Sequence, residues 1–86
     1  MDVAEAFGRA VKARRAELGV TQEDLAHKGE VARSFVSGLE RGEKAPTVRT
    51  VWKLAQALDC RPSDLWLTTE RLMESLPKKR RQGGAG

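Results

Sequence analysis

The sequence predicts an all-α domain made of five helices. Apolar residues recur at helical spacing along most of the chain, and the alternating runs typical of strands are absent. Proline occurs only at Pro46, Pro62 and Pro77, and none of the three interrupts a helical pattern. With 86 residues, of which 40% are hydrophobic, the chain is large enough for one compact core and too small for two.

The first helix is expected over residues 3–18 and the second over residues 22–28. The apolar face of the first helix, at about 100° per residue, is made of Phe7, Ala10, Val11 and Leu18. Gly19 follows it, and glycine is common just beyond a helix end because it adopts left-handed backbone angles freely. Thr21 is a good N-cap for the second helix, and Asp24 stands where a capping box needs an acidic partner. Gly29 is expected to break this helix.

The fourth and fifth helices follow Thr47 and Pro62. Thr47 is a suitable N-cap, and the helix after it has the strongest apolar pattern of the chain, made of Val48, Val51, Trp52, Leu54, Ala55 and Leu58. Pro62 suits the first turn of a helix expected over residues 62–76. The apolar stripe of this last helix is made of Leu65, Trp66, Leu72, Met73 and Leu76.

The net charge of +4 arises from the C-terminal end of the chain. Its four net positive charges match a single run, Lys78, Lys79, Arg80 and Arg81, and the rest of the chain holds 12 basic and 12 acidic residues. Nucleic-acid binding must therefore be argued from where charges lie and not from their sum. We expect a domain over residues 1–76 and a disordered basic tail over residues 77–86. The tail is either a solvated end or an arm that adds non-specific phosphate contacts.

Several functional classes are disfavoured by composition. One cysteine, Cys60, and one histidine, His27, form neither a disulfide nor a metal-binding cluster, so we expect no metal and no cofactor. The chain lacks a Ser/His/Asp or Cys/His set and a Gly-rich phosphate loop, and we expect no enzyme. No apolar run is long enough to span a membrane, and the acidic N-terminus is unlike a signal peptide. We expect a cytoplasmic protein with no evident small-molecule ligand.

The third helix, expected over residues 32–40 and ended by Gly42, has two contrasting faces. One arc of about 140° on the helical wheel holds Ala32, Phe35, Val36, Leu39 and Glu40. The opposite arc holds Arg33, Ser34, Ser37, Gly38 and Arg41. Small side chains let a helix approach base edges, and arginine offers a fork to guanine O6 and N7. The outward face therefore favours DNA reading over ordinary solvation.

Residues 7–58 resemble the Cro/repressor type of helix-turn-helix, the Xre family of bacterial and phage regulators. The resemblance rests on the ordered segments TQEDLA (residues 21–26), FVSGLERG (35–42), Pro46 and KLAQAL (53–58). Residues 33–41 are also similar to the recognition helix of restriction-modification controller proteins. The resemblance implies a lambda-repressor-like five-helix fold, double-stranded DNA as partner, and a bacterial or phage origin.

The resemblance also implies roles for individual residues. In this family the first residue of the second helix binds a phosphate, and here it is Gln22. The loop after the recognition helix and the start of the next helix also meet the DNA backbone, and these places hold Lys44 and Arg49. The full expected DNA-binding set is Gln22, Arg33, Ser34, Ser37, Gly38, Arg41, Lys44 and Arg49.

An inward carboxylate at Glu40 needs a partner. The family pairs this glutamate with the arginine four residues before the glycine that ends the first helix. Here the glycine is Gly19 and the arginine is Arg15. On the wheel Arg14 lies nearer the middle of the apolar face, so both arginines are candidates. We favour Arg15, because an edge position reaches across to a neighbour while Arg14 would extend outward to solvent.

Two residues depart from the family pattern at the turn before the recognition helix. Glu30 stands where glycine is usual, and it would be strained if this position needs a positive φ. Ala32 stands where serine or threonine usually caps the third helix, and alanine cannot cap.

These inferences predict a sequence-specific transcriptional regulator that binds a near-palindromic operator as a homodimer. Trp66, Leu67 and Met73 of the last helix would meet the partner copy, unless the whole stripe closes the core of the monomer. One alternative is an antitoxin with autoregulatory DNA binding, which a neighbouring toxin gene would reveal. Another is a protein-binding adaptor, which would carry acidic residues on the recognition face.

Overall fold

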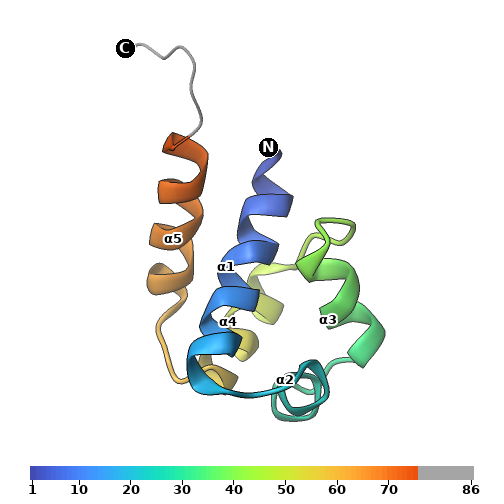
Figure 1. Cartoon of the computed structure of the whole chain (residues 1–86). Coiled ribbons are helices and arrows are strands. Elements are labelled where there is room, and N and C mark those ends of the chain that lie inside the picture. Colours follow the sequence, from blue (N-terminus) through green and yellow to red (C-terminus); the bar gives the residue numbers. More distant parts are fainter. Residues whose placement is uncertain (76–86) are drawn as a thin grey trace.

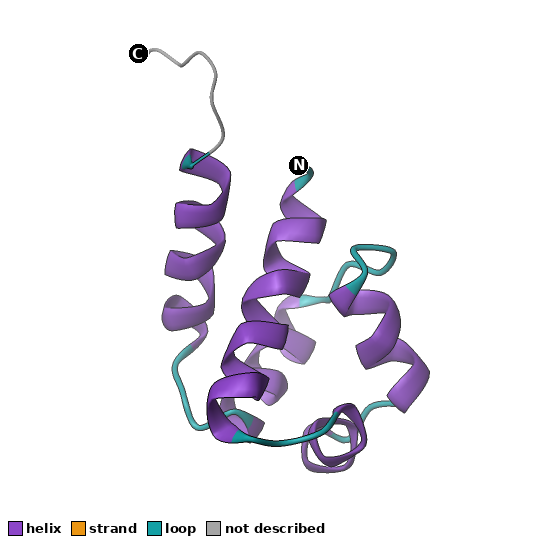
Figure 2. Cartoon of the chain, viewed as in Figure 1, coloured by secondary structure: helices purple, strands orange, loops and turns teal. Residues whose placement is uncertain are grey.

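A computed structural model describes residues 1–75 of the chain, and within them it contains five helices and no strand (Figures 1 and 2). The helices are α1 (Val3–Leu18), α2 (Gln22–Gly29), α3 (Arg33–Glu40), α4 (Val48–Ala57) and α5 (Pro62–Glu74). The predicted all-α fold class is confirmed. Leu76 and the predicted basic tail over residues 77–86 lie outside the described residues. No helix in the described part is long and apolar enough to cross a membrane.

The long helix α1 lies between α5 and the pair formed by α2 and α3. Figure 1 shows α5 running beside α1 in the opposite direction, while α3 lies on the other side of α1. Helix α2 contacts both α3 and α4. The core between the helices is formed by Phe7, Val11, Leu25, Ala26, Val36, Leu39, Leu54, Ala55, Leu58 and Leu65. Full burial of each large side chain stabilises the fold by about 1.5–3 kcal/mol.

Short-range capping bonds fix most helix ends as expected. Thr21 and Asp24 form the predicted capping box, because the Thr21 Oγ1 accepts from the Asp24 backbone N–H and the Asp24 carboxylate accepts from the Thr21 backbone N–H, both at 3.0 Å. The Thr47 Oγ1 accepts from the Thr50 backbone N–H at 3.1 Å and caps α4. Ala32 precedes α3 without a side-chain cap, and Gly19 ends α1 with a φ of 69°.

The end of α2 differs by one residue from the prediction. Gly29 belongs to the helix, where a Cβ would lie only 3.2 Å from Cδ2 of Leu54. Glu30 takes the left-handed position with a φ of 58°. A non-glycine residue there costs about 1–2 kcal/mol. Gly29 thus permits close packing against Leu54, while Glu30 bears the backbone strain. The Glu30 carboxylate also forms an ion pair with Lys53, with 3.5 Å between Oε1 and Nζ.

Three residues assigned to apolar faces by periodicity are exposed. Val48 is 89% exposed and Trp52 57%, and Leu18 at the end of α1 is exposed as well. The prediction that these side chains face the core is wrong. A helical wheel gives the angle of a side chain but not whether a neighbouring helix reaches that height along the axis.

Gly8, which the sequence analysis did not single out, marks a close crossing of α1 and α3. A Cβ at this position would lie 2.1 Å from the backbone oxygen of Leu39 and 3.0 Å from the Cα of Glu40. The crossing therefore requires glycine and brings the two backbones together. A lone glycine inside a helical pattern was the available signal, because it usually has a packing reason.

Candidate nucleic-acid interface

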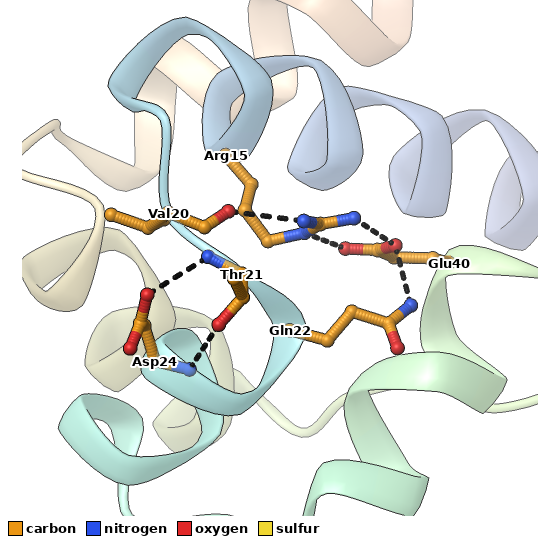
Figure 3. A network of polar contacts seen from close by, with 6 residues as sticks. All are labelled: Arg15, Val20, Thr21, Gln22, Asp24 and Glu40. Atoms are coloured by element: carbon orange, nitrogen blue, oxygen red, sulfur yellow. Dashed lines mark hydrogen bonds and ion pairs between the residues drawn. The ribbon is translucent and has the colours of Figure 1, made fainter.

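A network of charged and polar side chains fixes α3 to the two helices before it (Figure 3). Arg15 donates from Nε to Oε2 of Glu40 at 2.8 Å and from Nη2 to Oε1 at 3.0 Å. Its third nitrogen, Nη1, donates to the backbone oxygen of Val20 at 3.0 Å. Gln22 donates from Nε2 to Oε1 of Glu40, also at 3.0 Å. Helices α1, α2 and α3 are thus joined through one carboxylate.

The Glu40 carboxylate is ionised in spite of its burial. Its side chain is only 4% exposed. Burial raises the pKa of Glu40, but the hydrogen bonds from Arg15 and Gln22 and the positive charges of Arg15 and Lys12 together outweigh burial and leave the pKa below its usual value. The bond to Glu40 in turn raises the pKa of Arg15. Gln22, expected to hold a phosphate, therefore also has a structural role, with part of its donor capacity used by Glu40.

Arg14 has a different role from the one expected. It does not extend freely to solvent, because Nε donates to the backbone oxygen of Leu58 and Nη2 to that of Asp59, both at 3.0 Å. Those carbonyls follow the last turn of α4 and need donors. Nη1 of Arg14 also contacts Glu17 at 3.1 Å. Arg14 therefore ties α1 to the end of α4, and the structure places Arg15 beside Glu40.

The N-terminal end of α3 presents the polar face that the wheel predicted. Arg33 and Ser34 are exposed, whereas Val36 and Leu39 on the opposite side are fully buried. Phe35 is half-buried, and Ala32, placed on the inward arc by the wheel, is exposed because it precedes the helix as its N-cap.

Gly38 is buried and is not part of the exposed face, so its placement there by the helical wheel was wrong, while its contact with DNA stays a prediction. It is buried beneath the aliphatic stem of Lys44, whose Cγ would lie 2.8 Å from a Cβ at this position. The Gly38 backbone oxygen accepts from the Glu43 N–H at 2.8 Å. Gly38 therefore lets the loop after α3 fold back onto the helix, and this arrangement places the Lys44 side chain against α3.

Arg41 is held by Ser37 of α3 and by Glu43 of the loop that follows. Its Nε donates to Oε2 of Glu43 at 3.0 Å and its Nη2 to Oε1 at 2.9 Å, while Nη1 donates to Oγ of Ser37. The hydrogen bond from Arg41 lowers the pKa of Glu43. Arg41 and Glu43 are more than half exposed, and Ser37 is half-buried. Glu43 could not be found from the sequence pattern, because a pair two residues apart at the end of a helix follows no helical spacing rule.

Helices α2 and α3 lie in a segment of the sequence that matches a known family. A family model described as helix-turn-helix matches residues 11–65, which include both helices and the core that supports them. The chain belongs to the helix-turn-helix family. Its resemblance to the Cro/repressor type, inferred from residues 7–58, is confirmed.

Relatives and solved structures agree with this assignment. The helix-turn-helix domain is 40% identical over 58 residues to an uncharacterized HTH-type transcriptional regulator of Sinorhizobium fredii, covering 67% of this chain and 75% of the relative. It superposes on the clp gene regulator ClgR from Corynebacterium glutamicum with a TM-score of 0.83, 30% identity, and coverage of 86% of this chain and 79% of that one. It also superposes on the restriction-modification controller protein C.AhdI from Aeromonas hydrophila. The TM-score is 0.71 and the identity 37%, with coverage of 72% of this chain and 94% of that one.

On the other side of the helix-turn-helix domain, α5 leaves apolar side chains exposed. Trp66 is 49% exposed, Leu67 is similarly exposed, and Leu72 and Met73 are half-buried. Leu65 and Thr69 are both buried. An apolar pattern does not include Thr69 because threonine is polar, but its hydroxyl can be buried because it donates to the Leu65 backbone oxygen at 2.8 Å. Trp66 borders an apolar groove of about 440 Å³, whose other walls include Val3, Phe7, Pro46, Val51 and Pro62.

Cys60 and His27 show no sign of a reactive site in the helix-turn-helix domain. Cys60 is half-buried against the core, and burial raises the pKa of its thiol, so the less reactive protonated form is favoured. His27 is exposed on α2. Within residues 1–75, no three potential metal ligands of the His, Cys, Asp or Glu type lie together.

Proposed function

We propose that this helix-turn-helix protein is a sequence-specific transcriptional regulator that inserts α3 into the DNA major groove. The observation that carries the proposal is the contrast between the two sides of α3. Arg33 and Ser34 stand free at its N-terminal end, while Val36 and Leu39 anchor the helix in the core. Recognition helices of this class contact base edges chiefly through their N-terminal residues.

The side chains around α3 are suited to hold the DNA backbone. Gln22 lies in the first turn of α2, where backbone N–H groups and the helix dipole favour a phosphate oxygen. Lys44 lies beside α3, and Arg49 is exposed in the first turn of α4. In this proposal these three side chains bind phosphates, which orients α3 without reading sequence.

Arg33 and Arg49 are expected to differ in the kind of binding they support. Arg33→Ala should remove about 1–3 kcal/mol of discrimination at one base pair of each half-site, because its fork suits guanine. Arg49→Ala should weaken binding to all sequences about equally and reduce the salt slope by roughly one phosphate contact. The measurement compares both variants on a duplex selected by the wild-type protein from a random library and on its scrambled counterpart, at two salt concentrations.

Each variant is the control for the other, since both remove one exposed arginine charge. If Arg33→Ala lowers the affinity for both duplexes by the same factor, Arg33 grips only the backbone and sequence is read elsewhere. If the wild-type protein enriches no sequence from the library, the proposed function itself is wrong.

We further propose that two copies associate through the exposed side of α5. The side chains that would meet the partner copy are Trp66, Leu67 and Met73. The apolar groove beside Trp66 would receive a side chain of the partner copy. The exposure of Trp66 supports this over closure of the stripe within the monomer. A two-fold dimer would place two recognition helices about 34 Å apart and require a near-palindromic operator.

Trp66→Ala is expected to dissociate this dimer. Truncation of a central tryptophan commonly costs an interface about 2 kcal/mol or more, so the dimer dissociation constant should rise at least about thirtyfold. Sedimentation velocity at tens of micromolar would show a monomer for the variant and a dimer for the wild type. Trp52→Ala is the matched control, because Trp52 is similarly exposed but lies on α4. A wild-type monomer, or dissociation by Trp52→Ala alone, would refute the α5 interface.

A further inference from the structure

We propose that Glu43 is a specificity-determining residue, which holds Arg41 as a ready-made fork for a base pair and keeps it away from the phosphates. This inference rests on the proposed function, since it assumes that α3 faces a base-pair edge. It concerns a residue that makes no DNA contact of its own in the proposal. Glu43 would act through the position of the Arg41 guanidinium.

The geometry of the three side chains leaves a defined part of Arg41 available. A guanidinium carries five N–H groups. Glu43 takes the one on Nε and one of the two on Nη2, and Ser37 takes one of the two on Nη1. One N–H on each terminal nitrogen therefore remains. Donors on the two terminal nitrogens of a guanidinium can serve the O6 and N7 acceptors of a guanine in the major groove.

The contacts of Arg41 with Glu43 and Ser37, which we call the Arg41 clamp, are themselves fixed to the recognition helix. Ser37 lies one helical turn before Arg41, so the guanidinium is drawn back along α3. Glu43 cannot drift away freely, because its backbone N–H donates to the Gly38 oxygen at 2.8 Å. The free protein thus already holds the arginine near its working position, and little side-chain freedom remains to be lost when an operator binds.

The same clamp opposes non-specific attraction. Without Glu43, the long Arg41 side chain could turn to the nearest phosphate, which every sequence offers. With Glu43 in place, a phosphate must compete with a carboxylate that already occupies two donors of the guanidinium. Glu43 should therefore lower the affinity for arbitrary DNA while it preserves the affinity for the correct base pair.

The test is Glu43→Gln, measured on a duplex selected from a random library by the wild-type protein and on its scrambled counterpart. Exposed charge pairs contribute modestly, so we expect the ratio of the two affinities to fall about two- to fivefold. The affinity for the scrambled duplex should rise, with a salt slope steeper by about one phosphate contact. A repeated library selection should lose preference at the same base pair for Glu43→Gln and for Arg41→Ala.

Glu23→Gln is the matched control, because it removes the same charge from an exposed site in the first turn of α2. It should raise both affinities by one factor and leave their ratio unchanged. In an Arg41→Ala background, Glu43→Gln should no longer alter the ratio. If Glu43→Gln behaves like Glu23→Gln, Glu43 only repels phosphates and the inference is wrong. Failure of the wild-type protein to select any sequence would instead refute the proposed function, and the inference with it.

Discussion

Replacing Gly8 by alanine is expected to destabilise the domain by about 3 kcal/mol or more. The new Cβ would lie 2.1 Å from the Leu39 backbone oxygen, a distance that only a shift of α1 against α3 can relieve. Neither backbone can move without disturbing the Arg15–Glu40 contact between the same two helices. Urea unfolding followed by circular dichroism would measure the loss.

Gly38→Ala is the matched control for this substitution. It also adds one methyl group to a helical glycine, but its close neighbour is Cγ of Lys44, which belongs to a flexible side chain. Lys44 can move aside, and alanine favours the helix over glycine by about 0.5–1 kcal/mol. The Lys44 side chain must still shift to admit the new methyl group, so we expect Gly38→Ala to cost much less stability than Gly8→Ala. Equal stability of the two variants would contradict the close crossing at Gly8.

Glu40→Gln is expected to cost about 3 kcal/mol of unfolding free energy at pH 7. The substitution keeps the size of the side chain but leaves the Arg15 guanidinium without its counter-charge in a mostly buried place. Removal of one partner from a buried pair typically costs about 3–5 kcal/mol, and the partial exposure of Arg15 places this case at the lower end. Chemical unfolding of both proteins at several pH values is the measurement.

The pH dependence of this difference has a definite sign. The pKa of Glu40 in the folded protein lies below its usual value, so its stabilising effect is complete above the ordinary glutamate pKa of about 4.3. It is lost as the pH falls through the lower pKa of the folded state. The advantage of the wild type over Glu40→Gln should therefore be constant near neutral pH and shrink in acid.

Glu17→Gln provides the control on the same helix bundle. Glu17 pairs with Arg14 through an exposed contact, and such contacts contribute about 0–1 kcal/mol. A loss for Glu40→Gln no larger than that for Glu17→Gln would mean that the network does not fix α3. A difference that grows in acid would contradict the lowered pKa.

The ends of the helices could be read from the sequence alone. The capping box of Thr21 and Asp24, the cap at Thr47 and the stop at Gly19 each depend on bonds within three or four residues. Such bonds form from neighbouring residues, whatever the rest of the chain does. The same holds for the polar side of α3, because residues 33–40 share one helix and their angles follow from spacing.

The candidate site depended on distant contacts that no local pattern contains. Arg14 and Arg15 are adjacent on α1, yet the former reaches the carbonyl oxygen of Leu58, 44 residues away, and the latter binds Glu40. The choice between them depends on which helix lies beside each one. Likewise, the wheel placed Gly38 on the exposed face, but the loop after α3 folds Lys44 over it.

The sequence by itself therefore determined the helices, their caps, the family and the polar character of the recognition face. Only the tertiary structure decided which arginine binds Glu40, why Gly8 must be glycine, and that Val48 and Trp52 remain exposed. The physical reason is how far apart in the sequence the interacting residues lie. Periodicity and capping follow from atoms a few residues apart, whereas burial and ion pairing depend on how far each packed helix extends past its neighbours.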